Sequence, residues 1–189
     1  MNTIPAIEKE YGYILTYSGK RFYPDFPENL EADIIDIAHA LSNVCRYNGH
    51  LKSFYSVAQH SVLVSRYVRN MWPELALAAL LHDASEAYLP DMPSPIKANL
   101  PDFKLLENKV HEQIFKQFKL KWPYPALIKE IDKRIRVDEM KYMQEWGEEI
   151  DGKEGLGILI TPWGPSIAEE LFLEEYATLT GASPNNKVK

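Results

Sequence analysis

The sequence lacks the features from which several classes of protein are built. Its single cysteine, Cys45, excludes an intramolecular disulfide framework and a zinc ribbon, and it indicates a reducing compartment. No apolar run approaches the roughly 20 residues that a membrane-spanning helix needs. Residues 1–13 hold charges and a proline, so we expect neither a signal peptide nor a membrane anchor. We therefore expect a cytoplasmic protein without a membrane partner.

Positive charge is also scarce. The chain has 21 Lys and Arg against 27 Asp and Glu, which gives a net charge of -6 at pH 7. Such a balance disfavours binding to nucleic-acid polymers, but it leaves open a small phosphorylated ligand, because local charge in a pocket decides that case. With 189 residues, 46% of them hydrophobic, and no internal repeat, we expect a single domain over residues 1–189, with its core at about 33–146.

Hydrophobic periodicity predicts an all-α chain of about six helices with a minor N-terminal β-hairpin. The hairpin is expected at residues 13–23 around Gly19, and Asp33 and Ser56 are placed as N-caps of the first two helices. The stretch 147–165 contains several glycines and is expected to be irregular, with a short strand at 158–160. The helices are expected to begin near residues 34, 57, 73, 101, 124 and 166.

The end of the helix that begins at Pro73 carries the pattern most typical of a functional site. His82 is followed directly by Asp83, so two metal-ligand types stand side by side at the polar end of an apolar run. A core histidine beside a surface carboxylate is the structural alternative. Two other helices place His60 and Asp138 next to apolar neighbours, where an unpaired ionisable group would be costly to bury. Two imidazoles and two carboxylates suit Mn, Co, Fe, Ni or Zn, and Mg less well.

The order His60, His82-Asp83 and Asp138 resembles the signature of the HD-domain metal-dependent phosphohydrolases. The string from His82 to Glu86, followed by Asp91, Pro93, Pro95 and Lys97, is similar to the branch that includes bacterial 5′-deoxynucleotidases and phage dATP triphosphohydrolases. Arg46, 14 residues before His60, lies close to the place of a phosphate-binding arginine in that branch. The resemblance covers roughly residues 43–138.

The resemblance implies a site built on one divalent ion. His60, His82, Asp83 and Asp138 would be its ligands, which places Asp83 with Glu86 among the catalytic residues. Glu86 would transfer a proton. Of the residues implied to bind substrate, Arg46 and Lys97 would hold phosphate oxygens, Asp91 would contact the sugar, and Tyr47 stands where the branch often has a tryptophan that packs on the nucleoside. Relatives of this kind also imply a homo-oligomer, a dimer or a hexamer.

The expected function is hydrolysis of deoxynucleotides. Lys52, Lys97 and Arg66 near the site favour a dNTP triphosphohydrolase acting on a dATP-like substrate and releasing deoxynucleoside and triphosphate. A 5′-deoxynucleotidase that removes phosphate from dNMP is the alternative, since attack at the α-phosphorus serves both reactions. A nucleotide-binding regulatory module with a structural metal is an alternative of another class. A cyclic-dinucleotide or (p)ppGpp phosphodiesterase is disfavoured because no second His/Asp pair is seen.

Several of these residues can also be explained as structural or surface residues without a function. Glu86, Arg46 and Lys97 could be solvated surface charges, because a motif match is a hypothesis until its structural context is known. His39, His50 and His111 are expected to be structural or exposed. The role of Glu86 separates the enzyme from the regulatory module, because a structural metal has no need of a proton-transfer group.

Overall fold

Seven α-helices and one short hairpin form the part of the chain that the computed structural model describes, residues 12–143 and 154–182. The strands are β1 (Ile14–Leu15) and β2 (Arg21–Phe22), and the helices are α1 (Ile34–Asn43), α2 (Val57–Met71), α3 (Ala76–Leu80), α4 (Ser94–Lys97), α5 (Pro101–Gln117), α6 (Ala126–Met143) and α7 (Pro165–Thr180). The predicted helical class with a minor hairpin is confirmed. Among the described helices, none has both the length and the apolar content to cross a bilayer.

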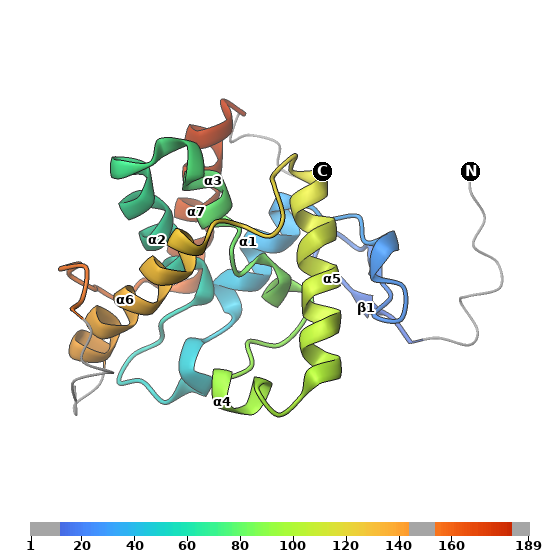
Figure 1. Ribbon diagram of the computed structural model, residues 1–189, viewed down its shortest axis with the longest axis horizontal. Coiled ribbons are helices and arrows are strands. Elements are labelled where there is room, and N and C mark those ends of the chain that lie inside the picture. The colour runs from blue at the N-terminus through green and yellow to red at the C-terminus, as the bar shows by residue number, and fades with distance from the viewer. Residues whose placement is uncertain (1–11, 144–153, 183–189) are drawn as a thin grey trace.

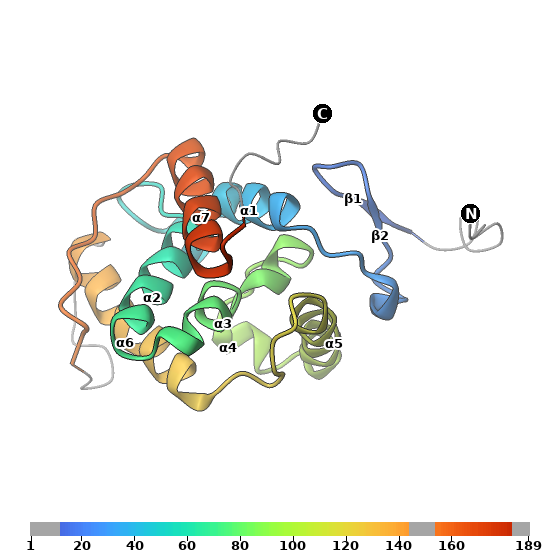
Figure 2. The same cartoon turned by 90° about the horizontal axis from the view of Figure 1, so that it is seen from above.

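The hairpin is attached to the helical part through α1. Its strands pair antiparallel, and Gly19 in the turn has a φ of 84°, which glycine adopts without strain. The backbone N–H and the hydroxyl of Ser18 donate to the carboxylate of Asp36 in α1, at 2.6 and 2.8 Å. Figures 1 and 2 show the hairpin at one edge of the molecule.

Side-chain caps fix the first turns of α1 and α2. Asp33 Oδ1 accepts a hydrogen bond from the N–H of Ile35 at 2.9 Å, and Ser56 Oγ accepts one from the N–H of Gln59 at 3.1 Å. Each bond satisfies a backbone donor that the helix itself cannot pair, which stabilises the helix by about 1 kcal/mol. Both N-caps are those expected from the sequence.

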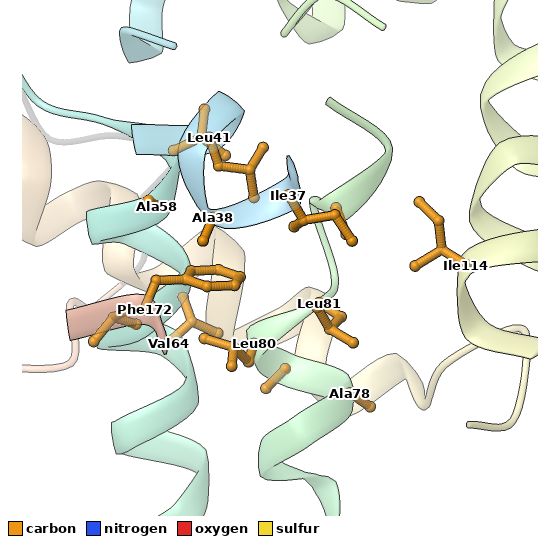
Figure 3. Close-up of a cluster of buried hydrophobic side chains, with 14 of the residues drawn as sticks. Ile37, Ala38, Leu41, Ala58, Val64, Ala78, Leu80, Leu81, Ile114 and Phe172 are labelled. Carbon is orange, nitrogen blue, oxygen red and sulfur yellow. The ribbon is translucent and has the colours of Figure 1, made fainter. Parts of the chain in front are cut away.

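The core lies where α1, α2, α3 and α7 meet. Figures 1 and 2 show α5 and α6 on opposite sides of the molecule, with α1 and α3 between them. Side chains from five helices come together in the close-up of Figure 3, and burying each large aliphatic or aromatic one contributes about 1.5–3 kcal/mol. They include Ile37, Ala38 and Leu41 of α1, Val64 of α2, Leu80 of α3, Ile114 of α5 and Phe172 of α7.

The helix expected from Pro73 to about Leu81 is broken into shorter pieces. Residues Pro73–Leu75 form a 3₁₀ turn, α3 ends at Leu80, and a second 3₁₀ turn follows at Ala84–Ala87. His82 and Asp83 therefore stand in a tight turn just beyond the helix. Because their backbone is not helical, the fixed angle between neighbouring side chains on a helix does not apply to them.

A segment without regular structure connects α6 to α2. Asp138 of α6 accepts hydrogen bonds from the backbone N–H groups of residues 156–158, at 2.8 to 3.3 Å. Gln59 of α2 bonds the carbonyl of Thr161 and the N–H of Trp163. The strand expected at 158–160 does not form, and the N–H group of Ile158 is bonded by the side chain of Asp138 and not by a neighbouring strand. The first part of the stretch expected to be irregular, with Gly147 and Gly152, lies outside the described residues.

Candidate metal centre and its pocket

Three elements bring two histidines and an aspartate to one point. His60 comes from α2, His82 from the turn after α3, and Asp132 from α6. The Nε2 atoms of the two histidines are 3.3 Å apart, and Asp132 Oδ1 lies 3.2 Å from His60 Nε2. Asp83 Oδ2 lies 3.6 Å from His60 Nε2 and 3.3 Å from His82 Nε2. These residues could hold a metal ion.

The hydrogen bonds of the two imidazoles direct their free nitrogens toward each other. His60 Nδ1 donates to Glu139 Oε1 at 2.6 Å, and His82 Nδ1 donates to the carbonyl of Ala79 at 2.7 Å. Because both partners are acceptors, each Nδ1 carries a proton, which leaves the Nε2 of each ring to bind a cation, either a second proton or a metal ion. Both rings are buried, and their Nε2 atoms face each other and the carboxylates of Asp132 and Asp83.

The spacing fits a divalent ion. Two nitrogens that each lie about 2.0–2.1 Å from a tetrahedral ion are about 3.3 Å from each other. Burial alone would lower the pKa of His82, but Asp83 and Asp132 raise this pKa well above its usual value. Conversely, burial opposes ionisation of Asp132, yet its bonds to the two histidines bring its pKa well below the usual value. The cluster therefore favours positive charge at its centre.

Asp138 does not join this cluster, and the prediction that placed it there is wrong. It lies six residues after Asp132 in α6, so the two side chains point about 120° apart around the helix and start about 9 Å apart along it. Only one of them can reach His60. Asp138 faces the segment after α6 and bonds its backbone instead, while Asp132 takes the expected place beside the histidines.

Glu86 lies in the second 3₁₀ turn and lines the cavity next to this cluster. It is 8% exposed, and its Oε2 has no hydrogen-bond partner among the described residues. Burial is the main cause that raises the pKa of Glu86 well above its usual value, and the negative charges of Asp83 and Asp91 raise it further. Burial thus favours the protonated form of this carboxyl group, and a protonated carboxyl group can give a proton to a neighbouring group.

The remaining predicted substrate residues line the same cavity, which has a volume of about 590 Å³. Arg46 is buried; its Nη1 lies 3.4 Å from Asp83 Oδ2, and its Nε has no partner in the described structure. Lys97 of α4 forms an ion pair with Glu107 of α5. Asp91 also faces the cavity, and burial raises its pKa. The structure thus gathers the four residues expected to bind substrate, Arg46, Tyr47, Asp91 and Lys97, around one space.

Tyr47 lies in a strained turn at the edge of the cavity. Tyr47 and Asn48 have φ values of 56° and 52°, in the left-handed region that residues other than glycine rarely adopt. The Tyr47 hydroxyl donates to Glu139 Oε2, so the end of the Tyr47 side chain is anchored on the side of the cavity where the metal cluster lies. Strained backbone of this kind costs about 1–3 kcal/mol and is common at functional sites.

Two basic residues that were expected near the site lie elsewhere. Arg66 Nε bonds Glu175 of α7 at 3.3 Å, and Lys52 is not among the residues that line the cavity. Instead, Lys104 of α5 and Lys129 and Arg136 of α6 line it. None of these three forms an ion pair within residues 12–143 and 154–182.

Comparison with known proteins gives a family but not an activity. The uncharacterized protein YfdR of Escherichia coli K12 is 38% identical to the chain over 175 residues, which span 89% of this chain and 96% of the relative. The chain belongs to the YfdR family. An uncharacterized protein of Rhodobacter capsulatus is 38% identical over 119 residues, 59% of this chain and 61% of that protein. No family model matches the chain.

Two residues of this YfdR family member, both in α6, were missed from the sequence. Asp132 and Glu139 lie seven positions apart on one face of α6, and that spacing was a usable signal. His111 of α5 was expected to be structural or exposed, and it is buried at the wall of the cavity, where it donates from Nε2 to the carbonyl of His82 at 2.7 Å. Burial lowers the pKa of His111 to about 4, so its ring is neutral at pH 7.

Proposed function

We propose that the chain is a metal-dependent phosphohydrolase of deoxynucleotides, of the HD-domain type that its sequence resembles. The observation that carries the proposal is the convergence of His60, His82 and Asp132, with Asp83 beside them, on the wall of a cavity that also contains Arg46 and Lys97. With Asp132 in the last position, the order His, His-Asp, Asp of the family signature is kept. A cavity of about 590 Å³ is within the range of small-molecule sites.

The side chains of the cavity divide the work of hydrolysis among them. A divalent ion held by the cluster would supply Lewis-acid help, polarising a phosphoryl oxygen and lowering the pKa of water. Arg46 can offer a planar fork of donors to phosphate oxygens, and Lys97 a point charge. Glu86, whose burial favours the protonated form, can give a proton to the oxygen that leaves the phosphorus and take one back from the attacking water. Electrostatic stabilisation of this kind supplies most of the catalysis in phosphoryl transfer.

The basic residues of the cavity favour a triphosphate substrate over a monophosphate. Arg46 and Lys97 are already close to carboxylates, whereas Lys104, Lys129 and Arg136 have no ion-pair partner among the described residues. Unpaired positive charge along the cavity is suited to phosphates beyond the first. We therefore propose a cytosolic dNTP triphosphohydrolase, with a 5′-deoxynucleotidase as the alternative that uses the same residues.

The test is a screen of deoxynucleoside mono- and triphosphates with Mn²⁺ or Co²⁺, with the products separated by chromatography. We expect deoxynucleoside and triphosphate from a dNTP. Glu86→Gln should keep the bound metal and lower turnover by about 10²–10⁴-fold, the usual contribution of a proton-transfer group. A wild-type protein that binds metal but hydrolyses no nucleotide would favour the regulatory module with a structural metal.

A further inference from the structure

The carboxylate of Glu139 lies fully buried between the metal cluster and the cavity. Its Oε1 accepts hydrogen bonds from His60 Nδ1 at 2.6 Å and from the Tyr55 hydroxyl at 2.8 Å. Its Oε2 accepts from the Tyr47 hydroxyl and lies 3.5 Å from Arg46 Nη2. One oxygen therefore holds a metal-cluster residue, and the other holds two residues that line the cavity.

Glu139 is not placed to be a metal ligand itself. It contacts Nδ1 of His60, whereas Nε2 of this ring faces His82 and Asp132. Because an oxygen of Glu139 accepts the hydrogen bond from His60 Nδ1, it keeps a proton on this nitrogen and leaves Nε2 free to bind a cation.

The geometry of a carboxylate connects its two sides. Its two oxygens belong to one planar group, so a rotation that weakens the contacts of Oε2 also moves Oε1 away from His60. The Tyr47 hydroxyl anchors Oε2 from the strained turn at Tyr47 and Asn48. The same turn carries Arg46, whose backbone N–H bonds the carbonyl of Tyr55 at 2.9 Å. The turn and the His60 imidazole therefore share Glu139 as a hydrogen-bond partner.

We propose that Glu139 is a positioning residue that couples the metal centre to the turn at Arg46 and Tyr47. The inference deepens the proposed function and rests on it. The Tyr47 hydroxyl contacts no residue of the metal cluster, yet it strengthens ion binding because it fixes Glu139, which fixes His60. By thermodynamic reciprocity, a bound ion then holds the turn in the position that meets a phosphate.

Tyrosine-to-phenylalanine substitutions test this coupling, because each removes one hydroxyl and leaves the ring in place. Tyr47→Phe and Tyr55→Phe should each weaken Mn²⁺ binding by about two- to tenfold, the value of one hydrogen bond. Tyr124→Phe is the matched control. Tyr124 lines the same cavity, and its hydroxyl makes no hydrogen bond among the described residues. The affinity of the Tyr124→Phe protein for Mn²⁺ should therefore differ from that of the wild type by less than about twofold. Isothermal titration calorimetry measures all three.

A double-mutant cycle shows whether Tyr47 acts through Glu139. Glu139→Gln removes the charge with little change of shape, and it should weaken Mn²⁺ binding by about 10–100-fold, as other outer-shell partners of metal-bound histidines do. In this background the further loss from Tyr47→Phe should shrink by at least half, because residues in one hydrogen-bond network are not additive. Circular dichroism of the metal-free proteins should show native helix content for every variant.

The outcomes separate this inference from the proposed function. If Tyr47→Phe and Tyr55→Phe bind Mn²⁺ as tightly as Tyr124→Phe does, or if the loss persists in full with Gln at position 139, Glu139 does not couple the two parts. These titrations need no substrate. Variants that behave as expected in a protein that hydrolyses no nucleotide would refute the proposed activity alone, and a wild-type protein that binds no divalent ion would refute both.

Discussion

Asp132 and Glu139 hold His60 from both sides of its ring. Asp132 Oδ1 lies 3.2 Å from His60 Nε2, and Glu139 Oε1 lies 2.6 Å from His60 Nδ1. The two acids are seven residues apart in α6, two turns along one face, so a single helix contributes both contacts. The relative placement of α2 and α6 therefore decides whether the metal centre can form.

The two aspartates of α6 should respond differently to the same substitution. Asp132→Asn should weaken Mn²⁺ binding by more than about tenfold, because it removes a charged ligand. Asp138→Asn should leave Mn²⁺ binding nearly unchanged but lower the free energy of unfolding by about 1 kcal/mol, because partly buried N–H groups lose a charged acceptor. Calorimetry and urea denaturation measure the two effects. Loss of metal binding in Asp138→Asn would return Asp138 to the site.

Gly155 should not tolerate a side chain. A Cβ at this position would overlap Asp138 Oδ1, so either the segment or the carboxylate must move. We expect Gly155→Ala to lower the free energy of unfolding by about 1–3 kcal/mol. Gly12→Ala is the control, because a Cβ there meets nothing within 4 Å. Equal urea midpoints for the two variants would show that the protein can make room for a methyl group beside Asp138.

The exposed lysines of the cavity should affect triphosphates more than monophosphates. Lys104→Ala and Lys129→Ala remove positive charge from two different helices that line the cavity. A solvent-exposed ion pair is worth up to about 1 kcal/mol, so each should raise KM for a dNTP by up to about fivefold. The KM for the matching dNMP should stay the same, and the effect on dNTP should shrink in high salt. Equal changes for both substrates would argue against a triphosphate.

The cap at Asp33 should make part of the stability depend on pH. Burial opposes ionisation of Asp33, but the ion pair with Lys20 and the bond from Ile35 lower its pKa below the usual value. The stability that the ionised form contributes is therefore complete above the unfolded pKa of about 3.9 and is lost as the pH falls through the folded pKa. Asp33→Ala should cost about 1 kcal/mol at pH 7 and less at pH 3, as measured by urea denaturation. A cost that does not change with pH would show that the charge contributes nothing.

The sequence was most informative where structure depends on near neighbours. The caps at Asp33 and Ser56 and the turn at Gly19 follow from local hydrogen bonding and backbone freedom, and all three are confirmed. The strand expected at 158–160 depended on a partner strand that the sequence could not supply. Its backbone is bonded by Asp138 from another helix, a contact between residues distant in sequence.

For the site, the sequence identified the types of residue better than their positions. His60 and His82 meet as the family resemblance implied, but the choice between Asp132 and Asp138 needed the helical face, since a signature gives the order of residues and not their direction. The predicted dimer or hexamer and the identity of the ion stay predictions.

The segment 154–163 links the helix that carries Asp132 to the helix that carries His60. At one end it is bonded by Arg134 and Asp138 of α6, the helix of Asp132, and at the other by Gln59 of α2, the neighbour of His60. A protease cut at the exposed Leu159, between these two anchors, would leave His60, His82 and Asp132 in the protein but would leave α2 and α6 held together by their direct packing alone. Whether the cut protein still binds an ion would therefore show how far this segment, and not the packing of the helices alone, keeps the three side chains together.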